Sequence, residues 1–428
     1  MRTTGMKILV VGGGGREHAI VDAIGRSKRV SRIFCAPGNA GIASIAECVP
    51  IGTMDFAALA DFAEKESVDL TVVSMDDPLC AGITDYFEDR GLRIFGTRKN
   101  AAIIEGSKAF AKELMLKYDI PTAKSVTFTD PAAALSYLEK TGYPAVLKAD
   151  GLALGKGVLI CADREEAAAG IREIMIDKKF GDAGNCVVIE EFLTGREVSV
   201  LAFADGKHIV TMSSAQDHKR IGDNDTGPNT GGMGTFSPSP FYTADIDRIC
   251  REKIYQRTID AMAAEGRPFK GVLFFGLMLT EEGPKVLEYN TRFGDPETQV
   301  VLPRLENDII DVMEACMDGT LDRIELKFSE RAAVCVVLAS GGYPGSYEKG
   351  KIITGLDELK TEEDVYCYHA GTAFDSEGNI VTNGGRVLGV CALGGDLISA
   401  RAKAYEAAGR IHFEGKYFRA DIGNALFN

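Results

Sequence analysis

The sequence predicts an α/β protein whose first domain contains a doubly wound parallel sheet. Short runs rich in β-branched residues alternate with helix-like segments from Lys7 to about Thr97, and this alternation is typical of parallel sheets covered by helices. A glycine loop follows the first of these runs, KILVVGG. The length of 428 residues is enough for about three domains that each bury a hydrophobic core.

Composition and charge exclude several classes of protein. The hydrophobic content of 45% and the charged content of 26% are ordinary for a globular chain. The net charge of −14 argues against binding to nucleic acids or anionic membranes, which both require a basic surface. No apolar run approaches the roughly 18 residues of a membrane span, and the N-terminal run has no signal-peptide cleavage site. We therefore expect a cytoplasmic protein.

The ten cysteines are scattered along the chain without a Cys-x-x-Cys pair. Several of them lie inside apolar runs such as AAVCVVLA. We expect small buried hydrophobic residues rather than zinc ligands or a disulfide framework.

The glycine loop after the first strand predicts an anion site. Gly12 to Gly15 and then Arg16 stand where a strand passes into a helix, and amides at a helix N-terminus point toward bound anions such as phosphate. Glu17 occupies the last glycine position of the Gly-x-Gly-x-x-Gly motif, so an NAD site is the weaker alternative.

A second region begins with EGSKAFAKELMLKYDIP, where Ser107 can cap a helix that ends before Pro121. YPAVLKADGLALGKGVLIC then predicts two strands joined by a glycine-rich turn, with Lys148 on the first strand and Lys156 in the turn. Glycines allow close approach to phosphate oxygens and lysines supply positive charge, so this turn could close over a nucleotide. The spacing does not match a Walker loop, and a flexible surface hairpin is the alternative.

Two further stretches follow in the same region. VVIEEFLTGREVSV predicts a strand that ends at adjacent carboxylates, where backbone groups could meet an adenine edge and a carboxylate could hold ribose hydroxyls, although paired glutamates are most often only solvated. AQDHKRIGDNDTGPNTGGMGTFSPSP lacks periodicity. Loops of that length in compact domains are usually functional or disordered, and its mixture of charge, asparagine and glycine favours function.

The stretch VLEYNTRFGDPETQ predicts a metal and phosphate site at the end of a strand, after a hairpin around Glu281 to Gly283. Glu288 and Asn290 alternate on the strand and therefore face the same side. Oxygen ligands suit magnesium, which keeps water and substrate phosphates as its other ligands. Arg292 continues this face, and its planar guanidinium suits a carboxylate or a phosphoryl oxygen. A surface salt-bridge cluster is the alternative.

The last segment begins at about Ser329 with RAAVCVVLASGGYPG. It contains short strands and turns and closes with a helix from about Asp396 to Gly409. We therefore expect a small C-terminal α+β domain.

Taken together, the motifs closely resemble the phosphoribosylamine–glycine ligase family of ATP-grasp enzymes, nearly from end to end. The resemblance is carried by GGGGREHA, APGNAG, EGSKAFAK, YPAVLKADGLALGKGV, QDHKRIGDNDTGPNTGGMG, NTRFGDPETQ and GYPGSYEKGK. It implies an N-terminal parallel-sheet domain over 1–104, an ATP-grasp domain over 105–328 with a mobile lid at about 123–194, and a C-terminal domain over 329–428.

The resemblance also implies a reaction of purine biosynthesis. ATP, glycine and 5-phosphoribosylamine would give glycinamide ribonucleotide, ADP and phosphate through a glycyl phosphate, with Mg²⁺ or Mn²⁺ as the metal ion. We expect a monomer, with a weak homodimer as the alternative, and no nucleic-acid or membrane partner.

Roles for the matched positions follow from the same resemblance. The catalytic residues would be Arg292, Asp217 and Lys219. The ATP-binding residues would be Lys108, Lys148, Gly155, Lys156, Gly157, Glu190, Glu191 and Glu197. The metal ligands would be Glu288 and Asn290. The substrate-binding residues would be Gly13, Gly14, Gly15, Arg16, Asn39, His218, Asn229, Gly231, Gly232, Asp295 and Glu297, of which Asp295 and Glu297 would either support their neighbours or contact the substrate amine.

The chain departs from the family pattern in two places. Where the family commonly has Gly-Pro-Glu, this chain has Met75, Asp76 and Asp77, which leaves open a related ligase with another amine substrate. The strand GVLFFGLMLT carries no second metal carboxylate, so the number of metal ions stays open. Hypotheses of a different class are an NAD-dependent dehydrogenase and a nucleotide sensor without turnover.

Overall fold

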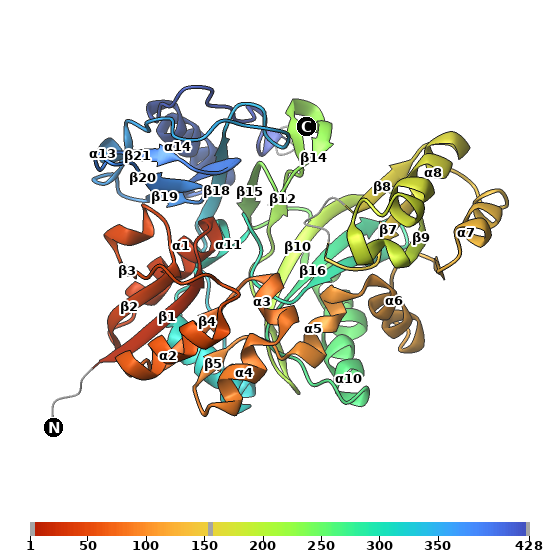
Figure 1. Cartoon of the computed structure of the whole chain (residues 1–428), viewed down its shortest axis with the longest axis horizontal. Coiled ribbons are helices and arrows are strands. Elements are labelled where there is room, and N and C mark those ends of the chain that lie inside the picture. Colours follow the sequence, from red (N-terminus) through yellow and green to blue (C-terminus); the bar gives the residue numbers. More distant parts are fainter. Residues whose placement is uncertain (1–4, 153–156, 425–428) are drawn as a thin grey trace.

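The computed structural model describes residues 5–152 and 157–424 and contains a five-stranded parallel sheet near the N-terminus (Figure 1). Ile8 and Val10 of its central strand pack against α1, whereas Leu9 and Val11 face α2 and α4. Helices therefore cover both faces, which confirms the doubly wound sheet. The strands, in the order β3-β2-β1-β4-β5, are β1 (Met6–Gly12), β2 (Val30–Pro37), β3 (Glu47–Cys48), β4 (Leu70–Val73) and β5 (Ile94–Phe95), and the helices are α1 (Gly15–Gly25), α2 (Phe56–Glu66), α3 (Asp76–Ala81) and α4 (Ile83–Asp89).

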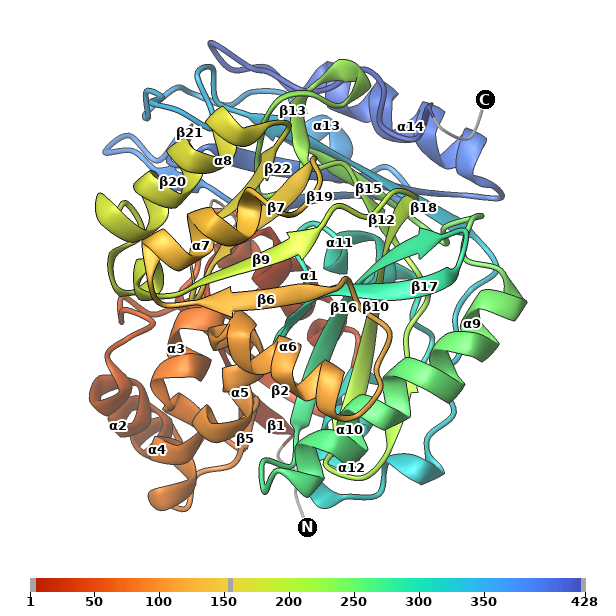
Figure 2. The ribbon, with the colours of Figure 1, turned by 90° about the vertical axis from the view of Figure 1, so that its right-hand side faces the viewer.

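A four-stranded antiparallel sheet forms a separate lobe, at the right of Figure 1 and toward the viewer in Figure 2. It has its own hydrophobic core against two helices. The glycine-rich turn between β7 and β8 includes 153–156, which lie outside the described residues. The strands, in the order β6-β9-β7-β8, are β6 (Ser125–Phe128), β7 (Ala145–Ala149), β8 (Val158–Cys161) and β9 (Val187–Glu191), and the helices are α7 (Pro131–Leu138) and α8 (Arg164–Ile171).

A second four-stranded antiparallel sheet lies at the centre of the molecule. Val200 faces the core shared with α6 and α10, whereas Phe203 faces the core shared with α1 and α12. The predicted hairpin is present, because Thr280 pairs with Gly283. The strands, in the order β11-β10-β16-β17, are β10 (Arg196–Asp205), β11 (Ile209–Thr211), β16 (Lys270–Thr280) and β17 (Gly283–Asn290), and the helices are α6 (Lys108–Lys117), α10 (Gln256–Ala264) and α12 (Ile309–Asp318).

The third large antiparallel sheet combines strands from two regions of the chain. Two of its five strands come from the long stretch without periodicity, which is therefore ordered rather than a simple loop. The helix predicted at Asp396 begins there, capped by that side chain on Ser399 N. The strands, in the order β12-β15-β18-β22-β19, are β12 (Gln216–Asp217), β15 (Gly234–Ser237), β18 (Ala332–Ala339), β19 (Val365–His369) and β22 (Arg386–Gly394), and the helix is α14 (Leu397–Arg410).

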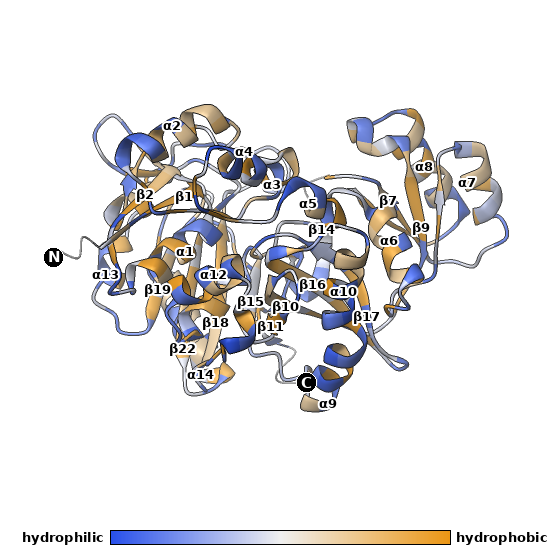
Figure 3. Cartoon of the chain, turned by 90° about the horizontal axis from the view of Figure 1, so that it is seen from below, coloured by the Kyte–Doolittle hydropathy of each residue, from blue (hydrophilic) through white to orange (hydrophobic). Residues whose placement is uncertain are grey.

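The remaining elements are short. Ser107 caps α6 as predicted, since its Oγ accepts from Phe110 N at 3.0 Å. Figure 3 shows hydrophobic residues concentrated in strands such as β9 and β19. Other short elements are α5 (Lys99–Gly106), α9 (Ala244–Cys250), α11 (Thr298–Val301), β13 (Arg220–Gly222), β14 (Thr226–Asn229), β20 (Thr372–Phe374), β21 (Ile380–Thr382) and α13 (Leu356–Leu359).

The cysteines and helices bear on two expectations. All ten cysteines are free, and six of them are buried, as expected for small hydrophobic residues. Within the described parts of the chain, no helix has the length and apolar character needed to cross a membrane.

Two buried histidines join the N-terminal sheet domain to the C-terminal sheet. His369 N donates to His18 Nδ1 at 2.8 Å, and Asn39 Nδ2 donates to His369 O at 2.7 Å. Burial lowers the pKa of His18 to about 3 and that of His369 to about 4. Both rings are therefore neutral in the folded protein near pH 7.

We expect Phe203→Ala to lower the free energy of unfolding by about 3–5 kcal/mol. Phe203 is fully buried and contacts Phe95 and Phe293 at ring distances of 6.2 and 6.0 Å, so its removal opens a cavity between the N-terminal sheet and the central sheet. Urea unfolding followed by circular dichroism measures the loss. Phe203→Leu is the matched control and should cost less than half as much; equal midpoints for wild type and Phe203→Ala would contradict this packing.

We expect acid to destabilise the protein partly through these histidines. Each folded-state pKa lies below the unfolded value of about 6.5, so the unfolded state takes up protons first as the pH falls from 6.5 toward 4. The unfolding free energy should then fall by up to about 1.4 kcal/mol per pH unit for each histidine. His18→Asn, which keeps an acceptor for His369 N, should reduce this slope, whereas the exposed His412→Asn should not. Identical slopes in all three proteins would contradict the assignment.

Candidate active site

The end of β17 carries a carboxylate surrounded by positive charge. Glu288 lies opposite Gly276 of β16, and its Oε1 is 3.6 Å from Lys219 Nζ. Burial would raise the pKa of Glu288, but Lys219, Lys148, Lys108 and Arg292 together hold it below its usual value. The carboxylate therefore stays ionised, as a ligand for a cation requires.

Glu105, at the end of α5, organises the residues that follow Glu288. Asn290 Nδ2 donates to Glu105 Oε1 at 3.1 Å, and Thr291 N and Oγ1 donate to Oε2 at 2.7 and 2.8 Å. The side-chain nitrogen of Asn290 is thus engaged, and no residue in 5–152 or 157–424 donates to its Oδ1, which could accept a hydrogen bond or bind a cation. Burial raises the pKa of Glu105, although Arg292 at 3.5 Å opposes this. Glu105 is the first residue of the motif EGSKAFAK, but its role was not predicted from the sequence.

Arg292 turns from the strand end toward the same site. Its Nη1 donates to Phe293 O at 3.2 Å and its Nη2 lies 3.5 Å from Glu105 Oε1. Its Nε is buried and has no hydrogen-bond partner in the described chain. A buried unpaired donor is costly, so this nitrogen is suited to an anionic ligand.

The second half of the site comes from β12 and the loop that follows β17. Lys219 Nζ lies 2.9 Å from Glu197 Oε2, and mainly for this reason its pKa is raised well above the usual value. Burial and the neighbouring charge of Glu297 raise the pKa of Asp217 well above that of a solvated aspartate. Burial likewise raises the pKa of Glu297. Two carboxylates with raised pKa values in one place can accept or hold a proton.

Glycines allow close approach here. Gly232 has φ +111°, and a Cβ at this position would lie 2.8 Å from Asp217 Oδ1 and 2.5 Å from Pro296 Cδ. Arg386 of β22 donates through Nη1 to the carbonyl oxygen of Gly231. The loop of Gly231 and Gly232 is therefore pressed between Asp217, Pro296 and Arg386.

Lysines from α6 and β7 gather around a carboxylate of β9, in the sheet β6-β9-β7-β8. Lys148 Nζ and Lys112 Nζ lie 3.0 and 3.2 Å from the buried carboxylate of Glu190. Burial lowers the pKa of Lys112 to about 8 despite Glu190. Lys108 Nζ donates to Gly151 O at 2.8 Å, in the turn that continues toward Gly155 and Lys156, both outside the described residues.

Three other residues predicted to bind ATP lie near this group. Glu191 accepts from Lys124 N at 2.9 Å through Oε1, and Glu197 pairs with Lys219. Gly157, which is described, accepts from Ala149 N at 2.9 Å and so closes the first pair of the β7–β8 hairpin.

The N-terminal glycine loop meets the site from the opposite side. Gly14 N donates to Glu17 Oε2 at 2.8 Å, and Ser74 Oγ donates to Glu17 Oε1 at 2.8 Å. Asn39 Nδ2 donates to Gly13 O at 2.9 Å. Glu17, which replaces the last glycine of the dinucleotide-binding motif, thus accepts the hydrogen bond of the Gly14 amide. In an NAD site this amide would have to be available to the cofactor.

Two guanidinium groups flank Asp295. Arg386 Nη2 lies 2.9 Å from Asp295 Oδ2, and Gln299 Nε2 donates to Oδ1 at 2.6 Å. Arg16 Nη1 reaches Phe293 O at 3.1 Å. Burial would raise the pKa of Asp295, but Arg386 and Arg16 hold it low. Its engagement favours the support role over direct contact with the substrate amine.

Two predicted substrate contacts lie apart from this group. The ring of His218 is buried with Nδ1 at 3.2 Å from Gly234 O and Nε2 accepting from Gly423 N at 3.2 Å. Asn229 is exposed at the end of β14. Arg386 and Lys112, by contrast, belong to the site although no local pattern distinguishes them.

The oxygen ligands at the end of β17 suit a divalent ion that takes only some of its ligands from the protein. Residues 5–152 and 157–424 contain no cluster of three or more His, Cys, Asp or Glu side chains that could hold a metal. One ionised carboxylate and one free amide oxygen, on Glu288 and Asn290, are the kind of sparse oxygen set that leaves positions for phosphate and water.

The two antiparallel sheets, with lysines and oxygen ligands where they meet, define the ATP-grasp class of proteins. A crystal structure of a biotin carboxylase from Campylobacter jejuni shares this fold, with a TM-score of 0.75 and 14% identity over 99% of this chain and 97% of the other.

This chain belongs to the phosphoribosylglycinamide synthetase family. Residues 6–105, 106–298 and 333–425 match the family models for the N domain, the ATP-grasp (A) domain and the C domain. The phosphoribosylamine–glycine ligase of Caldanaerobacter subterraneus subsp. tengcongensis is 50% identical over 97% of this chain and 99% of its own, and that of Escherichia coli (strain K12) is 46% identical over 98% of each. The crystal structure of phosphoribosylamine–glycine ligase from Thermotoga maritima has a TM-score of 0.83 and 36% identity over 97% of this chain and 100% of the other. The predicted family and fold class are confirmed.

We expect Glu105→Ala to lower both stability and turnover, because it leaves the buried Thr291 N without its partner and frees the amide of Asn290. The loss in unfolding free energy should be about 1–3 kcal/mol. Glu113→Ala, on the exposed side of α6, is the control and should change neither quantity. Urea unfolding and steady-state kinetics measure the two effects; a Glu105→Ala protein as active as the control would refute this role.

Proposed function

We propose that the protein is an ATP-dependent ligase that joins glycine to 5-phosphoribosylamine and releases glycinamide ribonucleotide, ADP and phosphate. The observation that carries the proposal is the identity of 46–50% with ligases of that name over nearly the whole chain. The cluster of cations and oxygen ligands at the end of β17 supplies the electrostatics that phosphoryl transfer needs.

ATP would bind between the sheet β6-β9-β7-β8 and the central sheet. Lys108 and Lys148 would contact its phosphates, together with Gly155, Lys156 and Gly157 of the turn. Glu190 supports this arrangement because it holds Lys148 at 3.0 Å. The half-exposed Glu191 and Glu197 are the proposed contacts to the adenosine.

Glu288 and Asn290 would hold the metal ion, which we propose to be Mg²⁺, with Mn²⁺ as a substitute. Such an ion, when bound, neutralises charge on the phosphates of ATP. Arg292 has the unpaired buried Nε described above and would hold the carboxylate of glycine and then the phosphoryl oxygens.

The reaction would proceed in two steps. A carboxylate oxygen of glycine attacks the γ-phosphorus of ATP, and ADP leaves as the glycyl phosphate forms. The amine of 5-phosphoribosylamine then attacks the carbonyl carbon, phosphate leaves, and the amine gives up a proton. Asp217 and Glu297, whose pKa values are raised, are the proposed acceptors of that proton.

Phosphoribosylamine would bind beside the N-terminal sheet. The proposed contacts are Gly13, Gly14, Gly15, Arg16 and Asn39, with Asp295 supporting Arg16. On the other side, Lys219, Gly231 and Gly232 would line the glycine site. His218 and Asn229 are retained as proposals, although the buried ring of His218 favours an indirect role.

Further parts of the proposal concern organisation. We propose domains over 1–104, 105–328 and 329–428, with a lid at about 123–194 that closes over ATP. We also propose that the enzyme acts as a monomer in the cytoplasm.

The proposal is tested by ADP release with ATP, Mg²⁺, glycine and freshly generated 5-phosphoribosylamine. We expect release to require both glycine and the amine, and alanine or serine to replace glycine poorly. ADP release that depends on glycine but is faster with another amine would instead support a related ligase. The reason for this alternative is that Met75, Asp76 and Asp77 stand where the family commonly has Gly-Pro-Glu. Release without glycine would overturn the proposal.

We expect Glu288→Gln to lower kcat by about 10²-fold or more, because a neutral amide holds a divalent ion and the neighbouring lysines poorly. The unfolding midpoint should change little. Glu281→Gln, at the exposed tip of the same hairpin, is the matched control. Steady-state kinetics over a range of Mg²⁺ concentrations measures the effect, and a wild-type rate at low Mg²⁺ would remove the role given to Glu288.

A further inference from the structure

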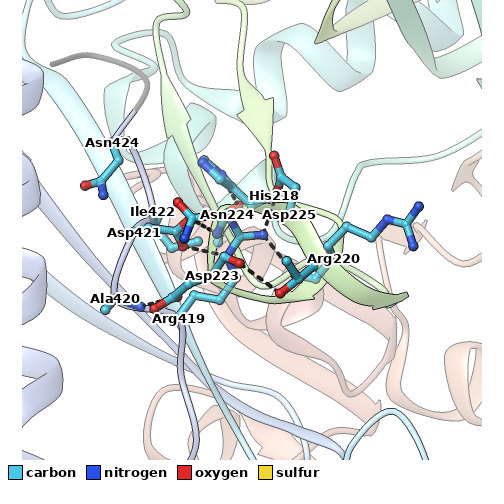
Figure 4. Close-up of polar contacts among 12 residues, drawn as sticks. His218, Arg220, Asp223, Asn224, Asp225, Arg419, Ala420, Asp421, Ile422 and Asn424 are labelled. Atoms are coloured by element: carbon cyan, nitrogen blue, oxygen red, sulfur yellow. Dashed lines mark hydrogen bonds and ion pairs between the residues drawn. The ribbon is translucent and has the colours of Figure 1, made fainter. Parts of the chain in front are cut away.

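Residues near the end of the described chain form hydrogen bonds and ion pairs with the segment from His218 to Asp225 (Figure 4). This segment directly follows Asp217 and includes Lys219. Arg419 is buried, and its Nε lies 2.7 Å from Asp421 Oδ1. Its Nη1 lies 2.9 Å from Asp225 Oδ1 and donates to Arg220 O at 3.0 Å. One guanidinium thus joins the C-terminal segment to β13 and to the turn that connects β13 with β14.

Backbone amides reinforce this contact in both directions. Asn224 N donates to Asp421 Oδ2 at 2.7 Å, and Ala420 N donates to Asp223 Oδ1 at 2.9 Å. Burial would raise the pKa of Asp421, but Arg419 and Asn224 N lower it to about 2. Asp421 is therefore charged at every physiological pH, and its hydrogen bonds are of the strong, charge-assisted kind.

His218 connects the same segment to the active site. Its Nε2 accepts from Gly423 N at 3.2 Å, and its backbone N donates to Gly234 O at 2.9 Å. Successive side chains of an extended chain point to opposite sides. With His218 held toward the C-terminal sheet, Asp217 and Lys219 are directed to the other side, where Glu297 and Glu288 lie.

The described contacts that hold the hairpin from outside come from the C-terminal part of the chain. All four residues of β14 are exposed, and an isolated two-stranded hairpin is marginally stable at best. Beyond the contacts of Arg419–Gly423, Tyr417 Oη donates to Ile221 O at 2.9 Å, and the Ile221 side chain packs against the C-terminal hydrophobic core. The loop after the hairpin is held by Gly231 N, which donates to Tyr343 Oη at 3.0 Å, and by Arg386 Nη1, which donates to Gly231 O. All of these partners belong to the C-terminal part of the chain.

We propose that residues 419–423, here called the C-terminal clamp, position Asp217 and Lys219 for catalysis, with Arg419 and Asp421 as positioning residues. This inference rests on the proposed function, because that function is what assigns catalytic roles to Asp217 and Lys219. Neither Arg419 nor Asp421 touches a reacting group; they act through the hairpin and His218.

The test compares Asp421→Asn with Asp364→Asn. Asn at 421 still accepts from Asn224 N but loses the ion pair with Arg419. Asp364 forms a more exposed ion pair with Arg331 elsewhere in the C-terminal part, and its φ of +69° is one that Asn tolerates. Hydrogen–deuterium exchange of the peptides over 218–232, kcat, the glycine KM, the ATP Kd and the melting temperature are measured for both variants and for wild type.

We expect Asp421→Asn to exchange faster over 218–232 and to lose about tenfold or more in kcat, since small misplacements of catalytic groups have effects of this size. The ATP Kd should be unchanged, because the lid and β17 are untouched. Asp364→Asn should match wild type in kcat and in exchange over 218–232. An Asp421→Asn protein with unchanged exchange, or with faster exchange and wild-type kcat, overturns the inference.

A second variant covers loss of folding. If Asp421→Asn has a melting temperature far below that of Asp364→Asn, the inference is tested with Asp225→Asn instead. The Asp225 side chain is 70% exposed, and its replacement removes only the ion pair between Asp225 and Arg419. Asp225→Asn should show the same pattern with a smaller fall in kcat, and no fall overturns the inference. Absence of glycine-dependent ADP release by wild type would refute the proposed function instead.

Discussion

Mutual neutralisation of charge at the end of β17 is the constraint on which the rest of the structure depends. Burying a carboxylate or a cation is costly unless an opposite charge or several donors accompany it. Glu288 therefore needs Lys219 from the segment after β12, and Glu105 of α5 needs Thr291 and Arg292. These partners come from regions far apart in the sequence, so the N-terminal, central and C-terminal sheets must meet here. A site assembled in this way is preorganised before any substrate arrives.

Local patterns predict the parts of this site that depend on period and turn chemistry. The two-residue alternation places Glu288 and Asn290 on one face, and the alternation of strands and helices predicts the parallel sheet. The pattern fails for β12 and β15, which have only two and four residues. β15 pairs with β18, about 100 residues later in the chain, and β12 pairs with β15. It also misses Glu105 and Arg386, because their partners are distant in sequence and a helix-end glutamate is most often solvated.

Fold and chemistry are separable in this molecule. The biotin carboxylase with the same fold is only 14% identical, so the two facing sheets alone do not specify a substrate. In this chain the residues closest to the proposed sugar and glycine sites lie outside those sheets: Arg16 on α1, Asp217 on β12 and Arg386 on β22. Substrate choice would then depend on how the flanking domains approach the central sheet. The C-terminal part would therefore contribute residues to the active site as well as stabilise the fold.

If the proposed function is right, this cluster of charges stabilises a mixed anhydride of glycine and phosphate. Isotope transfer tests this with glycine labelled with ¹⁸O in both carboxylate oxygens, together with ATP and 5-phosphoribosylamine, and mass spectrometry of the released phosphate. We expect one ¹⁸O atom in each phosphate and one retained in the product amide. Unlabelled phosphate released together with product would contradict it.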